Sequence, residues 1–130
     1  MMKILLVDDD PICNFLSKKA LRQIGYVNEV NIALNGEQAL NFFKNPEEPS
    51  SLPDVILLDL NMPVMDGFEF LEAFSKLNVP EKEKIRIIIV TSSNNRDDFA
   101  RARMFGVSQY LTKPIQEDEL FVALAMSDNT

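Results

Sequence analysis

The chain has 130 residues, of which 46% are hydrophobic and 25% are charged, the composition of one globular domain long enough for a sizeable core. A formal net charge of −7 opposes nonspecific binding to nucleic acid or to an anionic membrane surface. The sequence has no histidine and one cysteine, Cys13, which excludes serine–histidine catalysis, histidine metal sites, a phosphohistidine carrier and an intramolecular disulfide. Acids follow the first short apolar run, and no run approaches the ~20 apolar residues that cross a bilayer, so we expect a cytoplasmic protein without a signal peptide.

Three short, almost fully apolar runs predict strands that are covered on both faces: Ile4–Val7, Val55–Leu58 and Ile87–Val90. Glu29–Ala33 and Gln109–Leu111 are weaker strand candidates.

The first predicted helix begins at Pro11, with Asp10 placed to cap it and Gly25 placed to end it. Its apolar residues predict the face that packs inward: Ile12, Cys13, Leu16, Ala20 and Ile24.

Four more helices are predicted between and after the strands: Glu37–Lys44, Gly67–Leu77, a segment that follows "NNRDD" and ends at Gly106, and Glu117–Met126. Regular alternation of strands and helices predicts an α/β fold with a parallel sheet. The proline-rich loop Asn45–Pro53 and the loop Asn78–Lys84 each join a helix to the next strand. We therefore expect both at the amino edge of the sheet, away from the edge where such folds bind ligands.

Polar residues follow the predicted strands, and a parallel sheet would bring these strand ends to one edge: Asp8, Asp9, Asp59, Thr91, Thr112 and Lys113. Three clustered carboxylates need more compensation than one lysine gives, so a divalent cation is implied. Oxygen ligands without histidine or cysteine favour Mg²⁺ or Mn²⁺. The lysine and the threonine would then contact phosphate oxygens, and one carboxylate could itself be the nucleophile that forms an aspartyl phosphate.

Four motifs, in this order, resemble the receiver domain of two-component response regulators: "LLVDDDP", "VILLDLNMPVMDG", "IIIVTSS" and "YLTKPI". The resemblance runs from Lys3 to about Leu124. It implies a doubly wound, flavodoxin-like fold, with a five-stranded parallel sheet of order 2-1-3-4-5 and five flanking helices. We expect residues 1–130 to form one stand-alone receiver domain, with its core at about residues 3–126 and no output domain.

The resemblance also implies roles for individual residues. Asp59 would be phosphorylated by a histidine kinase or a histidine phosphotransfer protein. Asp9, Asp59 and the backbone carbonyl of Asn61 would bind Mg²⁺ directly, and Asp8 would act through a metal-bound water. Lys113 would pair with Asp59 and then with the phosphoryl group.

The resemblance also implies how the site would respond to phosphorylation. Thr91 would hydrogen-bond the phosphoryl group, and Tyr110 would be the aromatic residue that turns inward as Thr91 moves. The Lys113–Pro114 peptide bond would be cis. Asn61 and Ser93 occupy the positions that set the rate of aspartyl-phosphate hydrolysis, and a serine at the second position predicts moderate self-dephosphorylation.

We expect a signalling switch and not an enzyme with an external substrate: the chain would catalyse only its own phosphorylation and slow dephosphorylation. Phosphorylation would change the face formed by the fourth helix, the fifth strand and the fifth helix, where an unknown protein target binds. We expect no nucleic acid or membrane partner, and a monomer or a dimer promoted by phosphorylation. Two alternatives are a Mg²⁺-dependent phosphohydrolase of the haloacid-dehalogenase type, with Asp8 as nucleophile, and a receiver-like binding module that is never phosphorylated.

Overall fold

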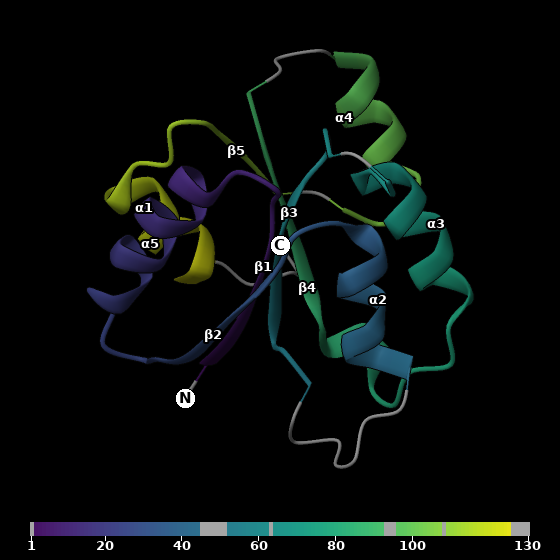
Figure 1. Cartoon of the computed structure of the whole chain (residues 1–130), viewed down its shortest axis with the longest axis horizontal. Helices are drawn as coiled ribbons and strands as arrows, with labels where there is room; N and C mark the ends of the chain where they lie inside the picture. The colour runs from purple at the N-terminus through teal and green to yellow at the C-terminus, as the bar shows by residue number, and fades with distance from the viewer. Residues whose placement is uncertain (1, 45–51, 63, 93–95, 108, 126–130) are drawn as a thin grey trace.

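The computed structural model describes residues 2–44, 52–62, 64–92, 96–107 and 109–125. Five parallel strands form one sheet in the order β2-β1-β3-β4-β5 (Figure 1). The strands are β1 Met2–Val7, β2 Val27–Ala33, β3 Val55–Asp59, β4 Arg86–Thr91 and β5 Gln109–Thr112. The helices are α1 Pro11–Arg22, α2 Gly36–Lys44, α3 Gly67–Lys76, α4 Arg96–Arg103 and α5 Glu117–Ala125. The predicted fold class and strand order are confirmed.

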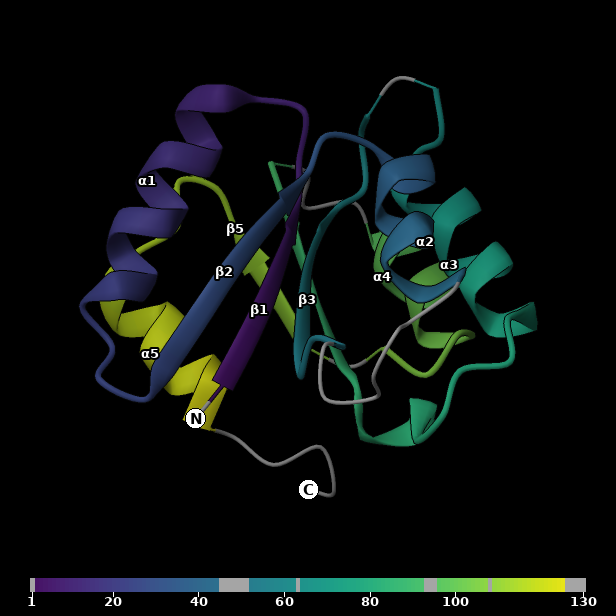
Figure 2. The ribbon, with the colours of Figure 1, turned by 60° about the horizontal axis from the view of Figure 1, so that its bottom comes forward.

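The sheet lies between two layers of helices, with α1 and α5 on one face and α2, α3 and α4 on the other (Figure 2). Neighbouring residues of the central strands alternate between these layers because side chains alternate along a strand. Leu6 and Leu57 pack in the core on the α1 and α5 side. Leu5 and Ile56 pack in the core on the α2 and α3 side. Burial on both faces explains why these strands read as continuous apolar runs.

Helix α1 begins as predicted, because the Asp10 side chain accepts a hydrogen bond from the Ile12 amide at 2.9 Å and Pro11 occupies the first turn. The predicted end at Gly25 is wrong, because the helix ends at Arg22 and is capped by Gln23.

The predicted inward face of α1 is also wrong in part. Ile12 is 70% exposed and Leu16 is 53% exposed, whereas the buried residues are Asn14, Ser17 and Leu21. The side-chain amide nitrogen (Nδ2) of Asn14 donates to the backbone carbonyl of Asp8 at 2.9 Å, which turns this polar face toward the end of β1. An apolar strip of α1 is therefore left facing outward.

Helix α3 is well defined at its start and well packed along its length. Asp66 and Glu69 form a reciprocal capping box, in which each side chain accepts from the backbone amide of the other. Phe70 stacks on Phe74, with ring centroids 5.5 Å apart, and both are buried.

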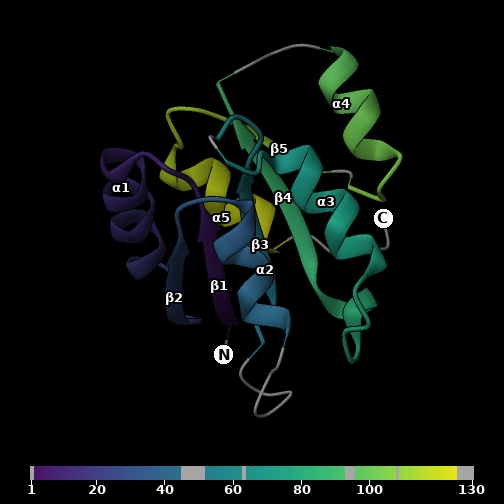
Figure 3. The same cartoon turned by 45° about the vertical axis from the view of Figure 1, so that its right-hand side comes forward.

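Helix α4 lies at the outer side of the same layer (Figure 3) and has one buried residue, Ala102. The Arg101 guanidinium lies over the ring of Phe68, 4.1 Å from its centroid. Beyond the helix, Gly106 has φ of +85°, a conformation that glycine adopts without a steric penalty.

The loop predicted at Asn45–Pro53 lies largely outside the described residues, and Lys82–Lys84 forms a short 3₁₀ turn before β4. In the described part of the chain, no helix combines the length and the apolar character needed to span a bilayer.

Candidate functional site

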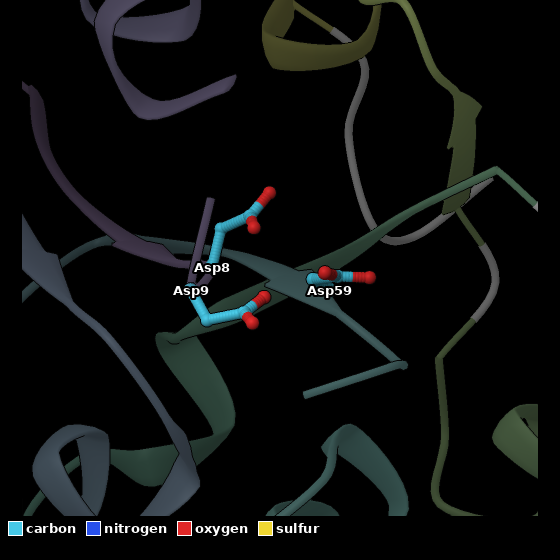
Figure 4. A group of neighbouring side chains, drawn as sticks. All are labelled: Asp8, Asp9 and Asp59. Carbon is cyan, nitrogen blue, oxygen red and sulfur yellow. The ribbon is translucent and has the colours of Figure 1, made fainter. Parts of the chain in front are cut away.

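Three carboxylates meet at the carboxyl edge of the sheet, where the adjacent strands β1 and β3 end. Asp8 and Asp9 follow β1, and Asp59 is the last residue of β3 (Figure 4). One carboxylate oxygen of each residue lies within 4.8 Å of the others. Asp8 and Asp59 are buried and Asp9 is exposed, so the cluster opens to solvent on one side.

Backbone and side-chain hydrogen bonds fix Asp8 in place. Its amide donates to the carbonyl of Ala33 at 3.0 Å, and its carboxylate accepts from the amide of Asp10 at 2.9 Å. Its carbonyl is the acceptor for Asn14. Sequence reasoning did not single out Asn14; the signal was a polar residue in the first turn of a helix that starts at the strand end.

Lys113 is the cation of the site. Its Nζ lies 2.8 Å from Oδ2 of Asp8 and 3.3 Å from Oδ2 of Asp59. The Lys113 amide donates to the carbonyl of Thr91 at 2.9 Å, which ties the end of β5 to β4, and the Lys113–Pro114 bond is cis. Lys113 therefore contacts Asp8 more closely than Asp59, the partner that the resemblance implied.

The charges of Asp8, Asp59 and Lys113 perturb one another. Burial alone would lower the pKa of Lys113, but its hydrogen bond with Asp8 and the charge of Asp59 outweigh burial and raise the pKa above its ordinary value of 10.5. Burial raises the pKa of Asp59 above 3.8, the hydrogen bond from Asn61 and the charge of Lys113 oppose this, and the charge of Asp8 adds to it. Lys113 is thus held as a cation, and the ionised Asp59 is under-compensated.

This donor set fits a hard divalent cation. It consists of carboxylate oxygens alone, which Mg²⁺ prefers, and the one ammonium group of Lys113 pairs with two of the three acids, Asp8 and Asp59. The Asn61 amide donates to Oδ1 of Asp59 at 3.2 Å, which keeps the backbone after β3 beside the carboxylate.

Gly67 allows α3 to begin directly against the site. A Cβ at this position would lie 2.7 Å from the backbone oxygen of Asp59 and 2.8 Å from Cα of Leu60. The Gly67 amide donates to the Leu60 carbonyl at 3.1 Å. The sequence predicted only that a helix begins at Gly67, and the signal that could have shown this close contact was the glycine at the start of that helix.

Thr91 lies on β4, the neighbour of β3, and Tyr110 lies on β5, at the edge of the sheet beyond β4. Thr91 is fully buried at the end of β4. The Tyr110 hydroxyl lies 3.0 Å from the carbonyl oxygen of Phe99 and 3.1 Å from that of Val107, so its single proton can be donated to either. The Tyr110 and Phe99 rings are 4.6 Å apart between centroids. Tyr110 thus bridges β5 and α4, while Ser93 lies outside the described residues.

Comparison with known proteins decides the family. The model of the response regulator receiver domain matches residues 4–125. The chain belongs to this family of receiver domains. It is 33% identical to a probable chemotaxis protein CheY of Rhizobium etli over 123 residues, which cover 95% of this chain and 89% of that protein. Among solved structures, the bacteriophytochrome response regulator RtBRR superimposes with a TM-score of 0.81 at 31% identity, covering 96% of this receiver domain and 76% of that chain.

Receiver domains occur alone and within larger proteins, and this receiver domain resembles both kinds. It is 34% identical to hybrid signal transduction histidine kinase I of Dictyostelium discoideum over 119 residues, which cover 92% of this chain but 7% of the kinase. Asp10 caps α1 and is not among the clustered carboxylates, so only Asp8 and Asp9 of the three consecutive acids join Asp59 at the site. This arrangement and the family both argue against the phosphohydrolase alternative.

Proposed function

We propose that this receiver domain is a phosphorylation-dependent switch of a two-component system, in which Asp59 accepts a phosphoryl group from a histidine kinase or a histidine phosphotransfer protein. The observation that carries the proposal is the convergence of three carboxylates and Lys113 at the ends of β1, β3 and β5. The proposal includes a cytoplasmic location, where the single cysteine stays reduced.

Asp9, Asp59 and the backbone carbonyl of Asn61 would hold Mg²⁺ (or Mn²⁺) directly, and Asp8 would hold it through water. When bound, the ion would neutralise the acids and coordinate oxygens of the incoming phosphoryl group. Asp8 is suited to the indirect role because its Oδ2 is already paired with Lys113.

In the transfer, a carboxylate oxygen of Asp59 forms a bond to phosphorus as the bond from phosphorus to the donor's histidine nitrogen breaks. Lys113 remains protonated, since its pKa is raised, and compensates negative charge at the acceptor oxygen. Thr91 then donates its hydroxyl hydrogen to the phosphoryl group. A phosphoryl group with three acceptor oxygens thereby gives Thr91 and Lys113 new partners.

The outward strip of α1 supports docking of the phosphodonor. Ile12, Phe15 and Leu16 are exposed large apolar residues on the helix that begins at Pro11, two residues after Asp9. Lys19 and Arg22 lie in the last turn of the same helix. An apolar strip beside a buried acceptor suits a partner that must bring a side chain to Asp59.

The output would be a shift in the population of two states of the face formed by α4, β5 and α5. The position of the Tyr110 hydroxyl, within hydrogen-bond distance of the carbonyl oxygens of Phe99 and Val107, supports this, because movement of Tyr110 would break its link to α4. Inverting a 1:99 equilibrium needs about 5.5 kcal/mol, which a few charge-assisted hydrogen bonds of ~1.5–3 kcal/mol each can supply.

The test is intact-mass measurement after incubation with acetyl phosphate and Mg²⁺. We expect one phosphate adduct that is base-labile, requires Mg²⁺ and is absent in Asp59→Asn. Asp10→Asn is the matched control, because it removes a neighbouring acid outside the cluster and should keep the adduct. Phosphate release that continues in Asp59→Asn would favour the phosphohydrolase alternative. A domain that forms no adduct would favour a binding module, and an adduct lifetime below seconds would contradict moderate self-dephosphorylation.

A further inference from the structure

The corner between β2 and α2, residues 33–36, has no acidic side chain, yet it contacts both segments that carry the clustered carboxylates. Figure 2 shows this β2–α2 corner at the same edge of the sheet as the ends of β1 and β3. On one side, the carbonyl of Ala33 accepts from the amide of Asp8 at 3.0 Å. On the other side, the amide of Gly36 donates to the carbonyl of Met65, in the loop between β3 and α3, at 3.0 Å. The corner therefore bridges the two backbone segments of the site.

Gly36 lies so close to the β3–α3 loop that no side chain fits between them. A Cβ on Gly36 would lie 2.7 Å from Cγ, 2.9 Å from Sδ and 3.0 Å from the backbone oxygen of Met65. Carbon atoms pack at about 3.5–4.0 Å, so any larger residue at this position has to move Met65. The φ angle of Gly36 is not in the left-handed region, so the glycine is needed for the close approach and not for its backbone conformation.

The β2–α2 corner is held in place by its own hydrogen bonds. Oδ1 of Asn35 accepts from the amide of Gln38 at 2.9 Å, as a helix cap does, and Oε1 of Gln38 accepts from the amide of Leu34 at 2.8 Å. Ala33 and Gly36 are both buried. A Cβ added at Gly36 would therefore displace the loop that faces it more readily than the corner itself.

The β3–α3 loop is fixed to the acceptor strand at both of its ends. The amide of Asn61 donates to Oδ1 of Asp59 at 3.2 Å, and the amide of Gly67 donates to the carbonyl of Leu60 at 3.1 Å. Between these ends Val64 has φ of 69°, a conformation that a β-branched residue keeps only where its surroundings impose it. A displacement of this short loop would therefore also move the carbonyl of Asn61 relative to the end of β1.

We propose that Gly36 is a positioning residue of the metal site, which acts through Met65 and sets the spacing between the end of β1 and the β3–α3 loop. This spacing determines selectivity for Mg²⁺. Mg²⁺ requires a near-octahedral set of oxygens at about 2.0–2.1 Å, whereas Ca²⁺ accepts more variable sets at about 2.3–2.6 Å. A displaced loop therefore weakens Mg²⁺ binding more than Ca²⁺ binding. The inference rests on the metal site of the proposed function.

The experiment titrates the full chain, without phosphodonor, with MgCl₂ and separately with CaCl₂, and obtains each Kd from amide chemical shifts. Gly36→Ala should weaken Mg²⁺ binding about tenfold, as substitutions behind metal ligands do, and Ca²⁺ binding less than about threefold. Gly25→Ala is the matched control: a Cβ on Gly25 meets no atom within 4 Å, so both affinities should be unchanged.

A double-mutant cycle tests the route through Met65. Met65→Ala removes two of the three atoms that a Cβ on Gly36 would meet. In that background, Gly36→Ala should weaken Mg²⁺ binding less than about threefold. The same loss with and without the Met65 side chain would overturn the proposal, and so would equal losses for Mg²⁺ and Ca²⁺ in Gly36→Ala.

If Gly36→Ala gives no spectrum of a folded protein, Asn35→Ala replaces it, because it loosens the β2–α2 corner without adding an atom. Asn35→Ala should weaken Mg²⁺ binding about two- to threefold, and an unchanged Kd would overturn the proposal. A wild-type protein that binds no Mg²⁺ would refute the metal site of the proposed function and this inference together. Binding of Mg²⁺ by the wild type that is equally tight in Gly36→Ala would refute this inference alone.

Discussion

Helices α3 and α4 cover the same face of the sheet, yet they are attached to it very differently. α3 begins with a capping box and buries five of its residues, among them the stacked Phe70 and Phe74. α4 buries only Ala102 and is linked by the Arg101–Phe68 contact and by the Tyr110 hydroxyl. The sequence of α4, "RDDFARAR", supplies little apolar surface to bury.

The difference indicates that α3 is firmly packed on the sheet, whereas α4 can move. α3 starts against the backbone of Asp59, so its position bears directly on the backbone that carries the Asp59 carboxylate. α4 is attached mainly through contacts that a single side-chain movement can break, and segments of low local stability are those that move in regulation. Four predictions test this contrast.

The largest effect is expected for Phe70→Ala, which removes a fully buried ring from α3. We expect a loss of about 3–5 kcal/mol in the free energy of unfolding, measured by urea denaturation. Phe99→Ala in α4 is the matched variant, and the half-buried ring should cost about 1–2 kcal/mol. Equal losses at Phe70 and Phe99 would remove the contrast between the helices.

Asp59→Asn tests the effect of the buried negative charge at the end of β3, against which α3 begins. The pKa of Asp59 is raised above 3.8 in the folded state, so the Asp59 carboxyl group stays protonated to a higher pH in the folded protein than in the unfolded chain. Stability therefore falls as pH rises through the interval between 3.8 and the raised pKa, and the loss persists at neutral pH. In EDTA, Asp59→Asn should raise the melting temperature at pH 7 by a few degrees and make no difference below pH 3.8. With Mg²⁺ the order at pH 7 should reverse, and a gain that is independent of pH would contradict this account.

Tyr110→Phe removes the hydroxyl that joins β5 to α4. We expect a loss of about 1 kcal/mol, seen as faster amide hydrogen exchange in α4 with unchanged protection in α3. Tyr26→Phe is the matched control, because the Tyr26 hydroxyl is buried and has no hydrogen-bond partner among the described residues. Its removal should be neutral or slightly stabilising.

The smallest effect is expected for Arg101→Ala, which removes the cation from the ring of Phe68. The contact should be worth about 0.5–1 kcal/mol, again measured as hydrogen exchange in α4. Arg103→Ala removes an exposed arginine of the same helix and should have no measurable effect. If both variants increase hydrogen exchange in α4 equally, the effect comes from helix propensity and not from the contact with the ring of Phe68.

The fold could be predicted because strands buried on both faces give apolar runs that need no tertiary information. Because β1 and β3 are parallel neighbours, the meeting of Asp8 and Asp59 at one edge of the sheet then follows. Strand order came from the family resemblance, since apolar runs alone do not say which strands are neighbours.

The errors arose where a tertiary contact outweighed local pattern. Apolar periodicity placed Ile12 and Leu16 inside, but the hydrogen bond of Asn14 to Asp8 turns α1 otherwise. No local rule predicts Val64 at φ of 69°, because β-branched residues avoid the left-handed region. The closer pairing of Lys113 with Asp8 than with Asp59 also depends on where β5 ends relative to β1.

The register of the sheet has a consequence for folding. β1 pairs Met2 with Val27 and Ile4 with Val55, so every contact that β1 makes in the sheet closes a long loop. Such non-local pairings form slowly, and the three carboxylates meet only after β1 and β3 are joined. A cation that binds the completed cluster should therefore slow unfolding far more than it accelerates folding.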